Sequence, residues 1–548
     1  MQHKLKIIPL GGVGEIGKNM TVIEYQDDIL IIDCGLIFPD EEMPGIDVVI
    51  PDMTYLEQNA GRIRGMCITH GHEDHIGAVP YAMERFRCPI YGTRFTNALI
   101  RHKLEEHKLT DVEVIDVDPG QAVKLGCFSV EFIKTGHSIA GAVAFAIRTP
   151  VGTLIHTGDF KIDLTPIDGE PIDINRFAYY GSKGVLALLS DSTNVERAGF
   201  TQSEKEIGKT FERVFTKAQG RVIVATFASN VYRIQQVADV AIEHGRVICF
   251  QGRSMEQIVK FAQELGYLHI PTDKIVRVEH LKNLPDSMVC VMTTGSQGEP
   301  MSGLFRMANS THKLNVGAGD TVIISASAIP GNERGVARVI NALYAKGADV
   351  VYDQMADVHV SGHACAGELR LMLGITKPKY FIPVHGEARH LKMHADLAME
   401  QGVSKERTFI AHNGAVIELS ARKGVMNETV QAGSLMVDGL QNIEDVVLRD
   451  RKTLSTDGLV ASVILLNAET GKLLAPVEIY SRGFIYMRDN EPLIAEASEL
   501  VYETAKQFEE KGKGDYSSVK NTVKSRLKSF LYDKTGRTPM ILPIVIEI

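Results

Sequence analysis

Four side chains that can bind a metal ion lie within six residues, in the segment 69-THGHEDHIG-77: they are His70, His72, Asp74 and His75. A strand-like segment (62–69) precedes them, and a helix-like segment (75–86) overlaps their end. Alternation along an extended loop aims His70 and His72 at one point, while Asp74 and His75 face a neighbouring point. Imidazole and carboxylate groups suit zinc and similar divalent ions. The pattern predicts a two-metal site in a strand–loop–helix unit, with a polar helix cap as the alternative.

Four ligands do not complete two metal shells, so further ligands are expected at other strand ends. Four more polar residues directly follow apolar strand-like segments and stand close to a glycine or a turn: Asp33, His137, Asp159 and His385. Each of them alone is typical of an ordinary turn or cap. Together with the 70–75 cluster they complete the ligand set, and Asp159 is the natural carboxylate to be shared by two ions.

The 548 residues favour three or four domains. Short β-type segments fill the chain to about residue 160, whereas from about residue 203 strand-like and helix-like segments alternate. Such alternation is typical of βαβ units with a parallel sheet. The predicted segments are 1–202, 203–355, 356–425, a linker at 426–447, and 448–548.

Composition bears on the partners and the cellular compartment that we expect for this chain. With 59 basic and 68 acidic residues the net charge is −9, which by itself argues against a nucleic-acid binder. Seven scattered cysteines without a CxxC pair indicate reduced thiols in the cytoplasm. No apolar segment reaches the roughly 20 residues of a membrane helix, so we expect no membrane association and no secretory signal.

At this point the motifs resemble a known family. HGHEDH with Asp33, His137 and Asp159 is similar to the metallo-β-lactamase fold. The inserted α/β block, DSTN at 191–194, SGHA at 361–364 and PVHGE at 383–387 resemble its β-CASP subgroup, and GEIGKN, FASN and VLRDR resemble bacterial ribonuclease J. The resemblance implies an α/β fold: an αββα metallo-β-lactamase sandwich (1–202, completed by 356–425), an inserted parallel α/β β-CASP domain (203–355) and a small C-terminal α/β domain (448–548).

The resemblance also implies roles for single residues. One zinc ion would be held by His70, His72, His137 and Asp159, the second by Asp74, His75, His385 and the shared Asp159, with manganese able to replace zinc. Asp33 would orient ligands without binding metal, and Asp74 would help to orient the attacking water. Asp191 and His363 match two later motifs, and His363 would lie near the scissile phosphate; a purely structural histidine is the alternative.

The activity implied is hydrolysis of RNA, with 5′-to-3′ exonuclease action on 5′-monophosphate ends, endonuclease action, and roles in mRNA decay and rRNA maturation. Ser229 and Asn230 stand at a predicted helix start, where free backbone N–H groups favour an anion. The opposing wall of a phosphate pocket would be His359, Val360, Ser361, Gly362 and His363. An ordinary helix cap is the alternative for Ser229 and Asn230. The net negative charge does not exclude an RNA substrate, because two metal cations and polar residues along a channel would bind the RNA backbone locally.

Weaker signals complete the prediction. A strand-like segment follows the GxGxxG of Gly12, Gly14 and Gly17, which argues against a dinucleotide site. Gly45, Asp47 and Asp438 match a calcium-like site that some family members carry. The C-terminal segment implies a homodimer or homotetramer, and RNA-degradation complexes are implied partners. The alternatives are a β-CASP nuclease acting mainly on DNA, a small-molecule hydrolase of the superfamily, and a non-catalytic RNA-binding scaffold.

Overall fold

The computed structural model describes residues 4–40, 42–299, 301–328, 332–439, 441–468, 470, 472–509 and 516–548. Its internal contacts divide the chain into two compact units. Unit 1 consists of Met1–Ile37 and Ile50–Ser434, and unit 2 consists of Phe38–Val49 and Leu435–Ile548. No helix among these described residues combines the length and the apolar character needed to cross a membrane.

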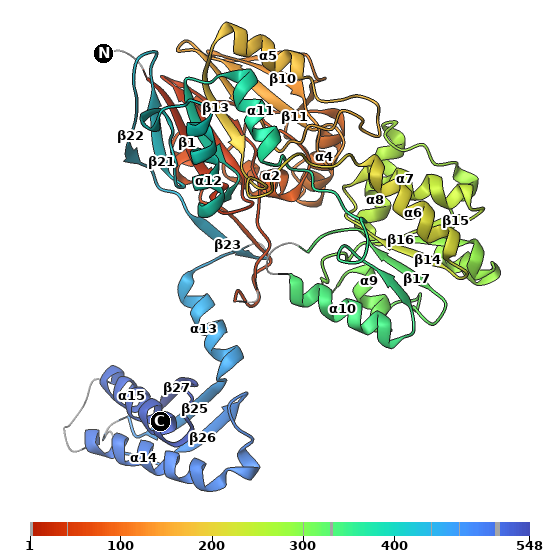
Figure 1. Ribbon diagram of the computed structural model, residues 1–548. Helices are drawn as coiled ribbons and strands as arrows, with labels where there is room; N and C mark the ends of the chain where they lie inside the picture. Colours follow the sequence, from red (N-terminus) through yellow and green to blue (C-terminus); the bar gives the residue numbers. More distant parts are fainter. Residues whose placement is uncertain are drawn as a thin grey trace. The chain divides into compact units, whose positions relative to one another are not determined.

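Two sheets form the centre of unit 1 (Figure 1). Their strands are rich in Ile, Val, Leu and Phe, whose inward side chains meet in one continuous core that includes Ile7, Leu30, Phe132 and Ile382. The first sheet has the order β22 (Gly424–Thr429), β21 (Ala415–Leu419), β1 (Leu5–Gly11), β3 (Met20–Tyr25), β4 (Asp28–Ile32), β6 (Ile63–Cys67), β7 (Ile90–Gly92), β8 (Val114–Asp116). The second has the order β19 (Tyr380–Val384), β13 (Val185–Asp191), β12 (Thr153–His156), β11 (Val143–Arg148), β10 (Phe128–Lys134), β9 (Ala122–Leu125).

Helices cover the outer faces of both sheets. Phe177, Leu369 and Leu397 pack against the outer face of the second sheet, from α5 (Ile174–Lys183), α11 (Ala366–Thr376) and α12 (Ala388–Glu400). Helix α4 (Arg94–Glu106) lies against β7 and β8 of the first sheet, with α3 (Val79–Arg85) beside it. This arrangement confirms the predicted αββα sandwich.

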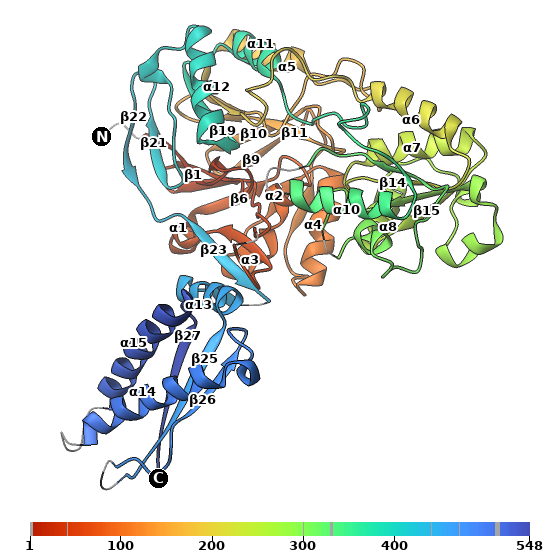
Figure 2. The same cartoon turned by 60° about the horizontal axis from the view of Figure 1, so that its bottom comes forward.

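A separate five-stranded parallel sheet confirms the predicted inserted α/β domain. Its order is β15 (Val247–Gln251), β16 (Val289–Thr293), β14 (Val222–Ala225), β17 (Thr321–Ile324), β18 (Asp349–Val351). Helices α9 (Gly303–Ala308) and α10 (Glu333–Ala345) pack on one face through Leu304 and Leu343. Helices α6 (Lys205–Lys217), α7 (Val231–Glu243) and α8 (Arg253–Glu264) also flank this sheet (Figure 2). Helices on both faces explain why the strands are apolar throughout.

Strand direction brings the predicted ligand segments to one edge of the sandwich. Strand β4 runs parallel to β6, and β12 runs parallel to β13, which runs parallel to β19. Since β10 and β12 are both antiparallel to β11, they also end at the same edge. Asp33, His70, His137, Asp159 and His385 each follow one of these strand ends. A backbone hydrogen bond from Val143 to Thr69 joins the two sheets there.

One predicted helix is two helices. The segment 75–86 is divided between α2 (Glu73–Ile76) and α3 (Val79–Arg85). Gly77 lies at the junction, where a Cβ atom would stand 2.4 Å from the side chain of Leu36. Pro80 occupies the first turn of α3, where its missing N–H costs nothing. The break lets α2 present Asp74 and His75 independently of the direction of α3.

Unit 2 contains a small sheet backed by helices. Strand β25 (Leu459–Leu466) lies between β26 (Glu478–Arg482) and β27 (Met540–Glu547). Helices α14 (Glu491–Glu509) and α15 (Tyr516–Thr535) pack on one face of it through residues such as Val501 and Leu527. Helix α13 (Asp445–Thr456) precedes β25, and β23 (Ser434–Asp438) pairs with β24 (Gln441–Ile443).

Candidate metal centre

Three histidine rings converge on one point at the edge of the sandwich. The Nδ1 atom of His72 lies 3.1 Å from Nε2 of His70 and 3.1 Å from Nε2 of His137. Oδ2 of Asp159 completes the group, at 3.7 Å from the His70 nitrogen and 3.8 Å from the His137 nitrogen. These are the four residues predicted for the first metal ion.

The second predicted group lies beside the first and shares Asp159 with it. Nε2 of His75 lies 3.3 Å from Oδ2 of Asp159 and 3.5 Å from Oδ2 of Asp74. Nε2 of His385 lies 3.2 Å from the same Asp74 oxygen, while its Nδ1 lies 2.9 Å from Oδ1 of Asp159. The Oδ2 atom of Asp159 is therefore the point where both groups meet.

The donor set fits two divalent ions. At metal–nitrogen bonds of about 2.0–2.1 Å, two ligands of a tetrahedral ion stand roughly 3.4 Å apart. The contacts of 3.1–3.8 Å within the three-histidine group have this spacing. Nε2 of His385 is buried and faces Oδ2 of Asp74 at 3.2 Å without a well-aligned hydrogen bond, as expected of two ligand atoms placed around a cation.

The histidines of the two groups differ in the direction of their pKa shifts. Burial lowers the pKa of His70 and of His137 well below the ordinary value and that of His72 to about 4, so these rings are neutral and present lone pairs. Burial also acts to lower the pKa of His75 and of His385, but Asp159 and the neighbouring carboxylates together outweigh it and raise both pKa values well above 6.5. The carboxylates of the second group thus favour positive charge beside them, which a bound cation can supply in place of the ring protons.

Asp33 holds the ligands without joining either group. Its Oδ2 lies 2.8 Å from Nδ1 of His75, and its Oδ1 accepts a 2.7 Å hydrogen bond from the Thr69 amide. Asp33 and His385 both adopt left-handed backbone conformations, with φ of 60° and 52°. Such strain in non-glycine residues is concentrated at functional sites. A carboxylate on the far nitrogen of a ligating imidazole is typical of metal centres.

The glycine-rich loop after β1 has a role that sequence analysis missed. The Gly12 carbonyl, at a residue with φ of 81°, accepts a 2.8 Å hydrogen bond from the His385 amide. Asn19 Nδ2 lies 3.0 Å from His75 Nε2 and donates to the Asp74 carbonyl at 3.0 Å. Strand β3 follows the loop, as predicted, so the segment supports ligands and not a dinucleotide. Asn19 lies within the GEIGKN motif, which is the signal that could have marked it.

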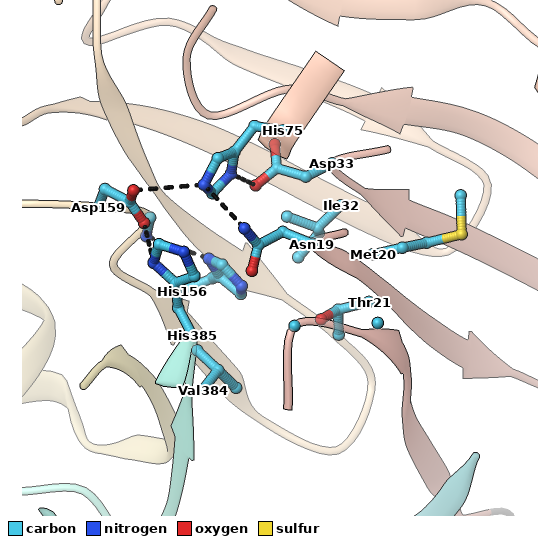
Figure 3. A pocket seen from close by; sticks show the side chains of 13 residues that line it. Asn19, Met20, Thr21, Ile32, Asp33, His75, His156, Asp159, Val384 and His385 are labelled. Carbon is cyan, nitrogen blue, oxygen red and sulfur yellow. Dashed lines mark hydrogen bonds and ion pairs between the residues drawn. The ribbon is translucent and has the colours of Figure 1, made fainter. Parts of the chain in front are cut away.

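Figure 3 shows this support around His75. Asp33, Asn19 and Asp159 are directed at its ring from different sides, and a small pocket lies between them. His156, which sequence analysis did not single out, also lines this pocket. Its Nδ1 accepts a hydrogen bond from the Gly158 amide at 3.1 Å and so shapes the turn that carries Asp159.

His363 and Asp191 form a pair next to the second group. Nδ1 of His363 lies 2.8 Å from Oδ2 of Asp191, and Oδ1 of Asp191 lies 3.5 Å from His385. Burial opposes the charge on His363, but Asp191 and Asp159 together outweigh it and raise the pKa of His363. The carbonyl of Gly362 accepts from Nδ1 of His137 at 2.7 Å, which leaves the Nε2 of that ring free for metal.

A buried glutamate that sequence analysis missed anchors the His363 loop. The Glu368 side chain accepts hydrogen bonds from the amides of Ile162, Thr201 and Cys365, each between 2.7 and 2.8 Å. Thr201 Oγ1 also donates to the His363 carbonyl at 2.8 Å. This carboxylate therefore ties the turn after Asp159 to the turn that bears His363. Nothing in its sequence surroundings distinguishes it from a surface glutamate.

The residues predicted for a phosphate pocket lie on two neighbouring segments. Asn230 caps α7, because its Oδ1 accepts from the Arg233 amide at 3.1 Å, as the alternative interpretation expected. Ser361 Oγ accepts from Asn194 Nδ2 at 2.7 Å, and burial lowers the pKa of His359 to about 4. Ser229 and Val360 lie within the same two segments.

The calcium-like residues of unit 2 are brought together, but their oxygens are satisfied by protein donors. Arg451 Nη1 donates to the Gly45 carbonyl at 2.6 Å, and its Nη2 donates to Oδ2 of Asp438 at 2.5 Å. The Gly439 amide donates to Oδ2 of Asp47 at 2.7 Å. The Arg451 guanidinium group thus competes with a cation for the oxygens of Gly45 and Asp438, which argues against a calcium ion at this turn.

Family models match four consecutive parts of the chain. Residues 13–189 match the metallo-beta-lactamase superfamily, and residues 219–343 match the ribonuclease J beta-CASP domain. Residues 348–411 match the Zn-dependent metallo-hydrolase RNA specificity domain, and residues 446–548 match the ribonuclease J C-terminal domain. The metallo-beta-lactamase match and the RNA specificity domain match together include all the predicted metal ligands.

Full-length relatives carry the same family name. The chain is 44% identical to ribonuclease J 1 of Streptococcus pyogenes serotype M3 (99% of this chain, 98% of the relative). It is 41% identical to ribonuclease J2 of Bacillus subtilis (100% and 99%) and 43% identical to ribonuclease J of Thermus thermophilus (100% and 96%). A solved Enterococcus faecalis V583 protein of unknown function shares the fold, with a TM-score of 0.51, 15% identity, and coverage of 76% of this chain and 100% of that one. These matches along the whole sequence, together with the clustered histidines and aspartates, show that the chain belongs to the ribonuclease J family.

Proposed function

We propose that this chain, a metal-dependent ribonuclease, degrades RNA from 5′-monophosphate ends in the 5′-to-3′ direction and also cleaves RNA internally. The observation that carries the proposal is the pair of ligand groups that meet at Asp159, beside the two segments suited to hold a terminal phosphate. The work would belong to mRNA decay and rRNA maturation. Seven unpaired cysteines suit a reducing compartment, so we assign this work to the cytoplasm.

The proposed metal assignment follows the two groups. His70, His72 and His137 would hold one zinc or manganese ion, Asp74, His75 and His385 would hold the other, and Asp159 would bridge them. Such a pair, when bound, supplies an activated water and offsets the charge of the phosphate in an in-line displacement. Asp74 borders both His75 and His385, so its carboxylate is placed to orient the attacking water.

His363 would supply the proton for the leaving group. The Asp191 carboxylate holds Nδ1 of the ring and favours its protonated form. The side chain of His363 is 20% exposed, so the rest of its ring is accessible to a substrate. Proton transfer from His363 to the 3′ oxygen would leave a 3′ hydroxyl on one product and a 5′ phosphate on the next.

The end-recognition part of the proposal rests on α7 and the segment 359–363. The positive end of the α7 dipole favours an anion, and Ser229 adds a hydroxyl, while the amides of Val231 and Arg233 already have internal acceptors. His359 is neutral at neutral pH, because burial lowers its pKa to about 4, so it would bind phosphate by a hydrogen bond and not as a cation. Each cycle would regenerate a 5′-monophosphate end for the next.

Unit 2 supports self-association. Helices α14 and α15 cover one face of its sheet, while Tyr480, Leu542, Ile544 and Ile546 are exposed on the strands that they do not fully cover. Val463 pairs with Ile544, so the exposed row continues onto the central strand. We propose that a second copy of this chain covers this face, in a homodimer or homotetramer. Ile544→Glu should convert the assembly to monomers in light scattering; an unchanged mass would reject this surface.

One substrate set tests the proposed activity. RNAs of one sequence with 5′-monophosphate, 5′-triphosphate and 5′-hydroxyl ends, the matching DNA, and a circular RNA would be incubated with zinc- or manganese-loaded protein. We expect mononucleotide products from the monophosphorylated RNA, slower release from the other ends, and internal cuts in the circle. Equal rates on all three ends would reject end selection, and preferred cleavage of DNA would reject the RNA substrate.

A further inference from the structure

A fully buried arginine stands three residues after the cap of α7. The side chain of Arg233 has no exposed surface, and its guanidinium group is hydrogen-bonded at all three nitrogens. Nε donates to Oε1 of Glu204 at 2.8 Å, and Nη2 donates to the same oxygen. Nη1 donates to Ser325 Oγ at 2.5 Å and to the Val358 carbonyl at 2.9 Å. The planar group thus joins three distant segments in one geometry.

These contacts fix the two walls of the proposed phosphate pocket to each other. Val358 directly precedes His359, and its carbonyl accepts a second hydrogen bond, from Ser325 Oγ at 2.6 Å. The backbone amide of Arg233 binds Oδ1 of Asn230 at 3.1 Å. One residue therefore holds the start of the 359–363 wall through its side chain and the cap of α7 through its backbone.

The same network leads to the metal centre. Oε2 of Glu204 lies 3.6 Å from Nζ of Lys161, and both groups are buried. Lys161 stands two residues after Asp159, and its amide donates to the Gly136 carbonyl at 2.7 Å, directly before His137. The Glu204 amide donates to Oδ2 of Asp163 at 3.1 Å, and Asp163 lies in the same segment after β12 as Asp159 and Lys161. A continuous series of hydrogen bonds and ion pairs thus runs from the turn bearing Asp159 to both walls.

We propose that Arg233 is a positioning residue that sets the 5′-monophosphate preference, by holding the 229–230 and 359–361 walls at a fixed distance from the metal ligands. This inference rests on the proposed function. Buried ion pairs contribute little net stability, so a geometric role accounts better for this one. A displacement of about 1 Å in a positioned group can cost about a hundredfold in rate. Internal cleavage does not use a terminal phosphate and should not depend on Arg233.

The test separates end selection from catalysis. Arg233→Lys keeps the charge but loses the fork of donors, and Ser325→Ala removes one support of Val358 without leaving a buried charge. The ratio of kcat/KM for 5′-monophosphorylated over 5′-hydroxyl RNA should fall by about tenfold or more in both variants. Their rate on circular RNA and their metal content should stay within about twofold of the unaltered protein.

Arg246→Lys is the matched control. Arg246 is also buried, but it binds the carbonyls of Ala218, Gly220 and Val289 at the opposite, amino-terminal end of the same sheet. Its variant should keep the end preference. If Arg233→Lys does not fold, Ser325→Ala decides the question. An unchanged preference, or an equal loss on linear and circular RNA in Ser325→Ala, would overturn the inference. Absence of any preference in the unaltered protein would instead overturn the proposed function.

Discussion

The histidine cluster of unit 1 and the Gly45–Asp438 turn of unit 2 are both predicted from the sequence to bind cations, yet they differ in what faces their ligand atoms. In unit 1, ring nitrogens face one another at 3.1 Å, and buried Nε2 of His385 faces the Asp74 carboxylate without a well-aligned hydrogen bond. In unit 2, Arg451 and the Gly439 amide already donate to the candidate oxygens. The donors around a set of ligands, more than the ligands themselves, therefore distinguish a cation site from an internal ion pair.

The largest expected effect comes from removing a ligand of the histidine cluster. His75→Ala takes away the nitrogen next to Asp159 and Asp74, and metal assistance is worth several kcal/mol of transition-state stabilisation. Nuclease activity should fall by about a thousandfold, and metal content measured by mass spectrometry should drop, while RNA binding persists. The exposed His412 provides the control, since His412→Ala should change neither quantity. Cleavage at the unaltered rate in His75→Ala would reject the ligand assignment.

A smaller effect is expected where a residue supports a ligand without binding metal. Asp33→Asn keeps the shape of the side chain but weakens the 2.8 Å contact with Nδ1 of His75. Metal affinity, measured by competition with a chelator, should fall by about 10- to 100-fold. Asp111→Asn, in an exposed ion pair with Arg87, should leave affinity unchanged. A loss as large as that of His75→Ala would mean that Asp33 binds metal directly.

The histidine-rich unit should also be the acid-sensitive one. Burial lowers the pKa of His394, which contacts Ser192, to about 3, so the unfolded chain binds the proton more readily. Stability is then fully present above the ordinary pKa of 6.5 and decreases as the pH falls toward 3. Between about pH 7 and pH 5 this residue should cost about 2 kcal/mol of the free energy of unfolding. His394→Gln should remove that slope in denaturant titrations; an unchanged slope would contradict a neutral buried ring.

The smallest effect concerns the turn in unit 2. Since Arg451 competes with a cation for the oxygens of Gly45 and Asp438, a calcium chelator or millimolar calcium should leave the melting temperature of the protein unchanged. Arg451→Gln should lower stability by about 1 kcal/mol or less, because the Arg451–Asp438 pair is partly exposed. Calcium that stabilised the unaltered protein would show a real cation site and remove the contrast between the two units.

Local chemistry and fold class were accessible from the sequence. The segment 70–75 shows its ligand density within one loop, and short apolar segments followed closely by a polar residue mark the strands that lead to Asp33, His137, Asp159 and His385. Helix boundaries were harder to predict. The break at Gly77 depends on close packing against Leu36, which lies in the loop after β4.

Local sequence is enough to predict which residue types stand at the strand ends, because ligand chemistry and strand length are local properties. Which of these residues meet depends on how the sheets and loops pack in three dimensions. Ile162 and Glu368 are 206 positions apart and Arg233 and Val358 are 125 apart, yet each pair is joined by a hydrogen bond. The same holds for the turn in unit 2, where Arg451 reaches a carbonyl 406 positions away. Such contacts form when the sheets pack and bury polar groups that must then find partners, and no local pattern in the sequence records which partner is found.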